Sequence, residues 1–241
     1  SMFAQIGTND ISAFKNRFEN APKQLKAGIN AVQYTYGVRP LIYSESFEFG
    51  VVQLNPSKMF ANTMAQYMSM SSLSGSMNMF QQMVDNQELL NSQYDLLIGK
   101  WPEQYDEVIM IISEKHAISD FMVYSLGWRD PAELKDMIQK VMAGEESTYE
   151  NEAMSWSYED FLNTEFKMVL PGNLYKYNKK YNVYEDMTDD EDYMKEVIKD
   201  GVSLKVVGVI AKKAGVSATC MQDGIAYRSD LSDYISKESY K

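Results

Sequence analysis

The chain has 241 residues, of which 45% are hydrophobic and 24% are charged, a composition typical of folded globular proteins. Its formal net charge of −11 argues against binding to nucleic acid or to an anionic lipid surface, because both require a basic face. Its one cysteine, Cys220, excludes an internal disulfide framework. No apolar run approaches the roughly 20 residues that a membrane helix needs. No basic stretch followed by an apolar one opens the sequence as a secretion signal would.

The first 57 residues predict two short helices followed by strands. Apolar residues at helical spacing predict a helix that ends before Pro22, and this proline suits the first turn of a second helix. Residues 32–38 contain alternating tyrosines and predict a strand. Residues 41–46 and 50–54 predict the two strands of a hairpin.

Residues 59–80 are rich in methionine and serine and lack a clean period, which predicts a loop flanked by short helical pieces. Two Met-x-Met pairs and a following phenylalanine stand out here, namely Met68, Met70, Met77, Met79 and Phe80. Thioethers are soft ligands that suit Cu(I), but no Cys or His accompanies these pairs, so we propose no metal site. Adaptable packing is one alternative. The other is contact with a peptide or partner protein, for which these five residues are the candidates.

Residues 94–127 predict a strand, a turn, a second strand and a helix. An apolar run at 96–98 stops at Gly99, and a polar turn with Trp101-Pro102 follows. The run at 108–112 is continuously apolar and rich in β-branched residues, as expected of a strand that is buried on both faces. Ser119 can then cap a short helix that ends at Gly127.

The second half of the chain predicts further helices and strands in irregular alternation. Periodicity and turn residues give helices at 131–141 and 157–162, a strand at 166–170, a tyrosine-rich hairpin at 174–184, a second strongly apolar strand at 204–210 and a last helix from Ser229. Irregular alternation with hairpins predicts an α+β fold, with a mixed or antiparallel sheet and packed helices.

The acidic stretch DMTDDED at 186–192 suggests calcium at first sight. It lacks the glycine and the distal glutamate of an EF-hand loop. Thr188 as a helix cap and Glu191 as the returning side chain of a capping box account for it, and acidic residues suit the first turn of a helix. The stretch therefore predicts a helix start.

No catalytic, cofactor-binding or metal-ligating residues are predicted, and the chain is not expected to be an enzyme. His116 is the only histidine and lies in a predicted turn, and Cys220 suits a small packing residue. One histidine and one cysteine do not make a zinc site, and the sequence contains no phosphate-binding glycine loop. Carboxylates are plentiful, so a hydrolase with an acid pair stays open as an alternative.

Three stretches in the same order carry a resemblance. They are AVQYTYGVRPLIYSESFEFGVVQLNPS at 31–57, GKWPEQYDEVIMI with the later ISDFMVYSLG inside 99–127, and VVGVI at 206–210 with the later GIAYRSDLSDYI at 224–235. Together they resemble the MacB-like periplasmic core domain of FtsX-like ABC-transporter permeases from Gram-positive bacteria. The Met- and Ser-rich segment matches no motif of that family.

The resemblance implies that residues 1–241 form a single extracytoplasmic domain, or two subdomains, of MacB-like type on the extracellular side of the cell membrane. Such a domain is non-catalytic and relays ATP-driven motion to export, extraction or peptide-resistance work. The implied partners are the transmembrane helices of the same permease, a cytoplasmic ABC ATPase reached through them, a second permease copy, and a peptide or lipoprotein substrate. The alternative is a stand-alone extracellular module that binds peptide or cell wall, and a secreted hydrolase comes after it.

Overall fold

The structure is a computed structural model that describes residues 11–35, 37–57, 79–143, 156–162 and 164–239. The chain divides into two compact units, Ser1–Gln33 and Tyr34–Lys241, and each is described by itself. Within the described ranges, no helix has both the length and the apolar character needed to span a membrane.

The first unit contains the two helices that its sequence predicts. Helix α1 (Ile11–Glu19) is followed by α2 (Lys23–Lys26), and Pro22 is the residue that precedes the first turn of α2. The Lys26 ammonium donates a hydrogen bond to the carbonyl oxygen of Glu19 at 2.5 Å, which links α2 to the end of α1.

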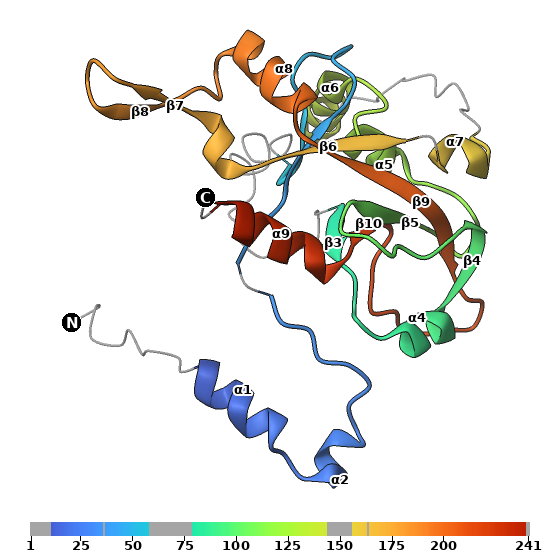
Figure 1. The fold of residues 1–241 in the computed structure, drawn as a ribbon. Coiled ribbons are helices and arrows are strands. Elements are labelled where there is room, and N and C mark those ends of the chain that lie inside the picture. Colours follow the sequence, from blue (N-terminus) through green and yellow to red (C-terminus); the bar gives the residue numbers. More distant parts are fainter. Residues whose placement is uncertain (1–10, 36, 58–78, 144–155, 163, 240–241) are drawn as a thin grey trace. The chain divides into compact units, whose positions relative to one another are not determined.

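A mixed sheet is the framework of the second unit (Figure 1). Within the described residues it has eight strands in the order β2-β1-β6-β9-β5-β10-β3, and β4 pairs with β9 beside this path. The strands are β1 (Leu41–Ser44), β2 (Gln53–Asn55), β3 (Phe80–Gln82), β4 (Tyr94–Gly99), β5 (Glu107–Ile112), β6 (Glu165–Val169), β9 (Val202–Lys212) and β10 (Gly224–Tyr227). The β5–β9 and β3–β10 pairs are parallel and the other pairs are antiparallel. The expected α+β class with a mixed sheet is confirmed.

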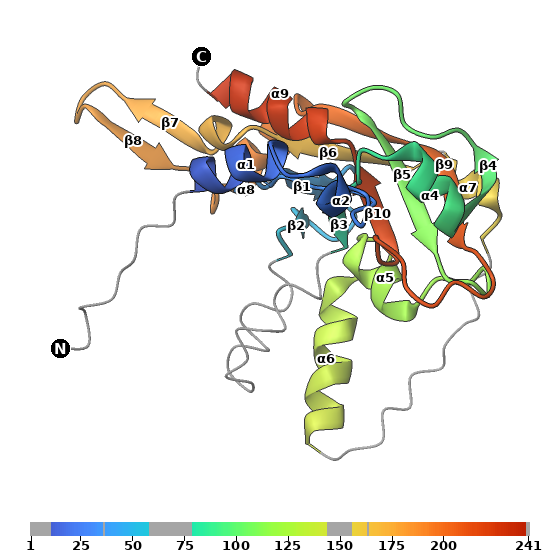
Figure 2. The same cartoon turned by 90° about the horizontal axis from the view of Figure 1, so that it is seen from below.

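Helices and one separate hairpin complete the second unit. The helices are α4 (Gln87–Gln93), α5 (Asp120–Ser125), α6 (Pro131–Met142), α7 (Tyr158–Leu162), the 3₁₀ turn η1 (Pro171–Leu174), α8 (Glu191–Lys199) and α9 (Ser229–Ser239). Strands β7 (Tyr175–Asn178) and β8 (Val183–Asp186) pair only with each other among the described strands. Figure 2 shows this hairpin extending away from the sheet.

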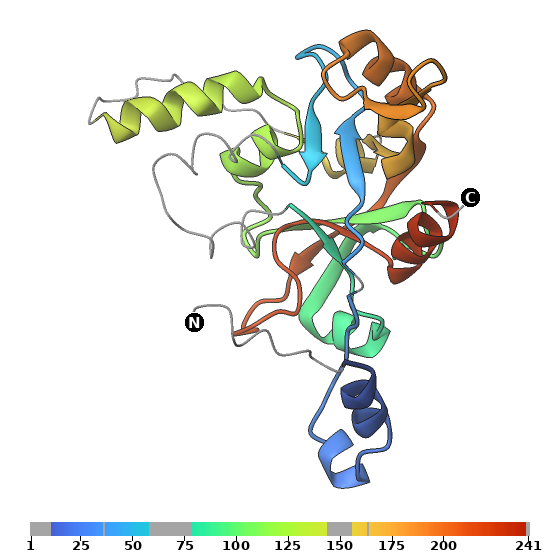
Figure 3. The same cartoon turned by 90° about the vertical axis from the view of Figure 1, so that its left-hand side faces the viewer.

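Strand β5 is buried on both faces, as its continuous apolar run predicts. Val108, Met110 and Ile112 point into one hydrophobic cluster, and Ile109 and Ile111 point into a second cluster on the other face. All five are at most 1% exposed, and burial of each side chain contributes about 2 kcal/mol. Leu231 and Ile235 place α9, red in Figure 3, against the first cluster.

Strand β9 contains one extra residue at its middle. Val206 pairs with Val108 and Gly208 pairs with Ile109, so Val207 has no partner on β5 and forms a β-bulge. The bulge changes the alternation of the strand, and Leu204, Val206, Val209 and Ala211 therefore all reach the same cluster. Before the bulge β9 pairs with β6, and after it with β4.

Several details differ from the sequence-based expectation. Residues 32–38 form no strand where the structure describes them, because they find no strand to pair with. Helix α8 is capped by Asp190, whose side chain accepts a hydrogen bond from the Tyr193 N–H at 3.0 Å, and not by Thr188. Cys220 is exposed, so its expected role as a packing residue is wrong.

The close contact between β4 and β9 gives a test of the fold. A Cβ at Gly208 would lie 2.3 Å from the Lys100 carbonyl oxygen, whereas a Cβ at Gly172 would meet nothing within 4 Å. We expect Gly208→Ala to lower the free energy of unfolding by about 3 kcal/mol, because the backbone on both sides must shift. Gly172→Ala, the matched control, should change it by less than about 1 kcal/mol. Urea unfolding measures both, and equal effects would contradict this account.

Candidate functional site

The turn between β4 and β5, residues 100–106, is fixed to the bulge of β9. Gly99 has a φ of 77°, and a Cβ on it would lie 2.2 Å from the Val207 carbonyl oxygen. Only glycine fits such an approach without strain. The Lys100 N–H donates to the same Val207 carbonyl at 2.9 Å. The bulge thus sets the direction in which the turn leaves the sheet, and we call residues 100–106 the β4–β5 turn.

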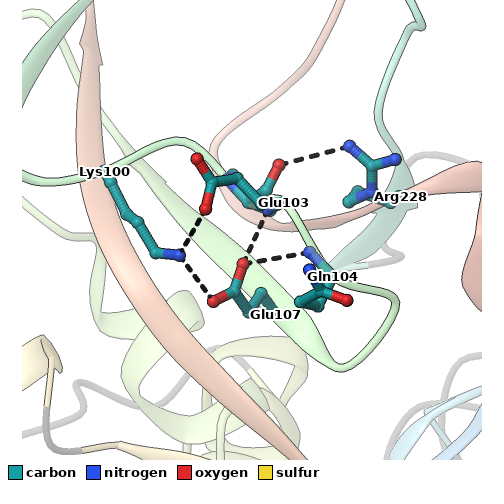
Figure 4. A network of polar contacts seen from close by, with 6 residues as sticks. Lys100, Glu103, Gln104, Glu107 and Arg228 are labelled. Carbon is teal, nitrogen blue, oxygen red and sulfur yellow. Dashed lines mark hydrogen bonds and ion pairs between the residues drawn. The ribbon is translucent and has the colours of Figure 1, made fainter.

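Three charged side chains close this turn on itself (Figure 4). The Lys100 ammonium lies 2.8 Å from a Glu107 carboxylate oxygen and 2.9 Å from a Glu103 carboxylate oxygen. The second oxygen of Glu107 accepts the backbone N–H groups of Glu103 at 2.6 Å and Gln104 at 3.0 Å. Glu107 therefore acts as a clamp, because one carboxylate holds the cation and the peptide groups of the turn together.

The clamp keeps both of its charged groups ionised. Burial raises the pKa of Glu107, but hydrogen bonds from Lys100 and from the N–H groups of Glu103 and Gln104 lower it, and the net result is a lowered pKa. Hydrogen bonds to Glu107 and then to Glu103 raise the pKa of Lys100. The Glu107 side chain is only 15% exposed, whereas that of Glu103 is 68% exposed, so Glu107 is the residue whose loss should matter.

The β4–β5 turn is also attached to helix α9. The Arg228 guanidinium donates to the Pro102 carbonyl oxygen at 3.3 Å and pairs with Asp230 at 3.0 Å. Tyr105 stacks on Tyr234 with ring centroids 4.4 Å apart and planes 15° from parallel. One polar contact from the residue before α9 and one aromatic contact from its second turn thus hold the start of α9 to the β4–β5 turn.

The first residues of the second unit reach the same helix through Gln82 of β3. The Gln82 side chain donates to the Tyr34 carbonyl oxygen at 3.5 Å and accepts from the Ser232 hydroxyl at 3.4 Å. Burial raises the pKa of Tyr227, the last residue of β10, and the charge of Arg39 lowers it in part. Residues from all three motif-bearing stretches therefore meet around the start of α9.

A second feature is a surface cavity of about 320 Å³ lined by Glu45, Phe47, Lys167, Ile198 and Lys199. The Lys167 ammonium donates to the Ser203 hydroxyl at 2.7 Å, and the two residues are opposite one another on β6 and β9. The Lys199 ammonium lies 5.8 Å from the centre of the Phe47 ring. Two ammonium groups and one carboxylate beside apolar walls could hold a small charged ligand.

The candidates for partner contact are only partly described. Met68, Met70 and Met77 lie outside the described residues, and Met79 is half-buried and packs against the core. Phe80 is 2% exposed and forms an edge-to-face contact with Phe166, with ring centroids 5.3 Å apart. The expectation that Phe80 meets a partner is therefore wrong, because β3 carries its side chain into the core.

The residues considered for chemistry are His116 and the acidic stretch 186–192. His116 has a positive φ of 56° and its Nδ1 lies 2.9 Å from the Tyr158 hydroxyl, so its partner is neither a serine nor a carboxylate. Among the residues with described positions, no three His, Cys, Asp or Glu side chains are grouped as metal ligands. The acidic stretch 186–192 forms the end of β8, a turn and the start of α8.

Sequence reasoning singled out none of the residues of this site. Lys100, Glu107 and Arg228 lie within the three motif-bearing stretches, but the Arg228–Pro102 contact spans 126 positions and no local pattern predicts it. The Lys167–Ser203 pair was missed because it exists only through strand pairing. Comparison with protein families, with characterised proteins and with solved structures finds no match to this chain.

The clamp should make stability depend on Glu107 in a pH-dependent way. A carboxyl whose folded pKa is lowered stabilises the fold above its unfolded pKa, and the contribution is lost as the pH falls through the folded pKa. We expect Glu107→Gln to lower the free energy of unfolding by about 2 kcal/mol at pH 7. The difference from wild type should shrink as the pH falls below the ordinary carboxyl range.

Glu103→Gln is the matched control, because Glu103 holds the same lysine from an exposed position. The Glu103→Gln variant should lower the free energy of unfolding by less than about 1 kcal/mol. Urea unfolding at neutral and acidic pH measures both variants. A Glu107→Gln deficit that stays constant down to the acid limit would contradict the assignment of the clamp.

Proposed function

We propose that this chain is a non-catalytic extracellular domain of an ABC-transporter permease of the FtsX-like kind, with a MacB-like periplasmic core. In this role it relays movement, driven by an ATPase on the other side of the membrane, to export, extraction or peptide-resistance work. Its partners are the transmembrane helices of the same permease and, through them, the ATPase.

The observation that supports this proposal most directly is the attachment of α9. Arg228, which precedes the helix, and Tyr234 and Ser232 within it fasten α9 to the β4–β5 turn and to β3. Leu231 and Ile235 bury it against the sheet. Tyr34, at the start of the second unit, contacts the same strand β3. A domain that is pulled or rotated from its ends needs both ends anchored to one stiff body.

The mixed sheet has the stiffness that such a relay requires. Strand β5 is buried on both faces and β9 is paired along both edges, and packed cores transmit displacement because they compress little. The clamp at Lys100, Glu103 and Glu107 ties the connection between β4 and β5 to this body. Force applied to α9 would therefore reach the centre of the sheet through few contacts.

A stand-alone extracellular binding module is the second candidate. The cavity beside Phe47 and the lysines Lys167 and Lys199 favours it, because a module of this kind needs a site for a small charged group. The two candidates differ in what holds the protein at the membrane and in whether an ATPase accompanies it.

Purification of the natural protein that carries this chain distinguishes the two. From membranes solubilised in mild detergent, we expect it to co-purify with an ABC ATPase subunit, and the complex should hydrolyse ATP. Release of the protein by a salt wash without detergent, or purification without any ATPase subunit, would overturn the permease proposal and favour the binding module.

A variant at the α9 attachment tests the relay itself. Arg228→Met removes the hydrogen bond to Pro102 and the pair with Asp230, and we expect ATP hydrolysis by the complex to persist while transport or resistance falls several-fold. Lys237→Met, on the exposed part of α9, is the matched control and should behave as wild type. Equal transport by both variants at equal membrane levels would contradict a relay through this contact.

A further inference from the structure

The β7–β8 hairpin is an exposed aromatic surface that the proposed function does not use. Tyr175, Tyr177, Tyr181, Val183 and Tyr184 are all among the exposed large hydrophobic side chains. Its base is anchored to α8, since the Tyr193 hydroxyl donates to the Asn173 carbonyl at 3.1 Å. Figures 1 and 2 both show the rest of the hairpin extending beyond the sheet.

Three of the tyrosines lie on one face of the hairpin. Tyr177 is opposite Tyr184 and Tyr175 is opposite Asp186, and side chains two positions apart on a strand share a face. The Tyr177 and Tyr184 rings have centroids 5.2 Å apart. Tyrosine is enriched at the centres of protein interfaces because it offers a large contact area at a low entropic cost.

The charges along the hairpin are separated. The tip carries Lys179 and Lys180, and the Lys180 ammonium lies 5.0 Å from the centre of the Tyr181 ring. The base carries Lys176 opposite Glu185 and also Asp186, and the following turn and the start of α8 carry Asp189, Asp190, Glu191 and Asp192. In a chain with a net charge of −11, the hairpin thus has a positive tip and a net negative base.

A two-stranded hairpin with an exposed aromatic face needs further packing to be stable. A two-stranded hairpin is marginally stable alone, and further strands or an apolar cover are needed to complete it. The side chains of both four-residue strands are exposed except that of Asn178, which is half-buried. Asn178 stiffens the turn, since its side chain accepts from the Lys180 N–H at 3.0 Å and donates to Glu185 at 2.7 Å. The hairpin is thus ordered and its tyrosine face is open.

We propose that the tyrosine face of this hairpin docks on the same face of a second copy of the chain, with the two hairpins antiparallel. A two-fold axis through the Tyr177–Tyr184 pair brings each tip over the base of the other copy. Lys179 and Lys180 then meet the acidic base, and this contact occurs twice. The surface is self-complementary in charge, and it fits no uniformly acidic or uniformly basic partner as well.

The strand length and register of the hairpin set the distance between its two charged sites. Four residues of extended chain span about 14 Å, so the tip and the base are far enough apart to act as separate charged sites. At the base, Tyr175 lies where the Lys180–Tyr181 pair of the other copy arrives, and a cation beside an aromatic ring is favourable. The inference rests on the hairpin alone, and it holds or fails independently of the permease proposal.

A charge-swap experiment tests the proposal. At up to about 100 µM, the wild-type chain should give a concentration-dependent dimer in sedimentation and light scattering, with twice the 27.6 kDa of one chain. Lys179→Glu with Lys180→Glu makes tip and base both negative. Asp189→Lys with Asp192→Lys places two lysines at the base and removes most of its negative charge. Each double variant should weaken dimerisation at least about tenfold, because the attraction between tip and base is lost in both contacts.

Mixing the two double variants should restore a one-to-one dimer. The negative tip of the first variant then meets the added lysines at the base of the second, and the positive tip of the second meets the unchanged acidic base of the first. Restoration also shows that both variants are folded. Lys115→Glu with Lys237→Glu, two exposed lysines outside the hairpin, is the control of equal charge change and should dimerise as wild type. A wild-type chain that stays monomeric, or a dimer that neither double variant weakens, would overturn the proposal. The tyrosine face would then bind a different partner.

Discussion

The second unit depends on the contact of two glycines across β4 and β9. Gly99 and Gly208 are paired in the register of these strands, and their backbones approach so closely that a Cβ on either would meet backbone atoms at 2.2–2.3 Å. The contact exists because Val207 is bulged out of the β5 register and offers its carbonyl to Lys100. That hydrogen bond fixes the direction of the β4–β5 turn and the position of Lys100. The position of Lys100 in turn allows the clamp by Glu107.

The clamp and the attachment of α9 form one continuous structure. Glu107 holds the backbone of the turn from within, while Arg228 and Tyr234 hold the same turn from the side of α9. None of these contacts is strong alone, since exposed charge pairs contribute little. Because they share one short turn, ordering by one lowers the entropic cost of the next. Because of this cooperation, we attribute the attachment of α9 to the β4–β5 turn as a whole and not to any one pair of residues.

Sequence patterns predicted the elements with strong local signals. The apolar run of β5, the capping serine of α5 and the proline start of α6 all appear as expected. Strands β3 and β10 have only three and four residues, and they are strands because of partners far away in the chain, which no short window contains. The same limit applies to the site, where Gln82 joins Tyr34 to Ser232 across 48 and 150 positions. The cap of α8 was misplaced because acidic stretches offer several equivalent oxygens.

The bulge at Val207 also constrains how the length of this chain can vary. A regular strand alternates its faces, so removing one residue from its middle reverses every side chain on one side of the deletion. In β9 the extra residue lets Leu204 and Val206 on one side, and Val209 and Ala211 on the other, enter the same core. A chain one residue shorter here would turn half of β9 outward. Related chains that keep this core must therefore keep the spacing between Val206 and Val209, whatever residues they place there.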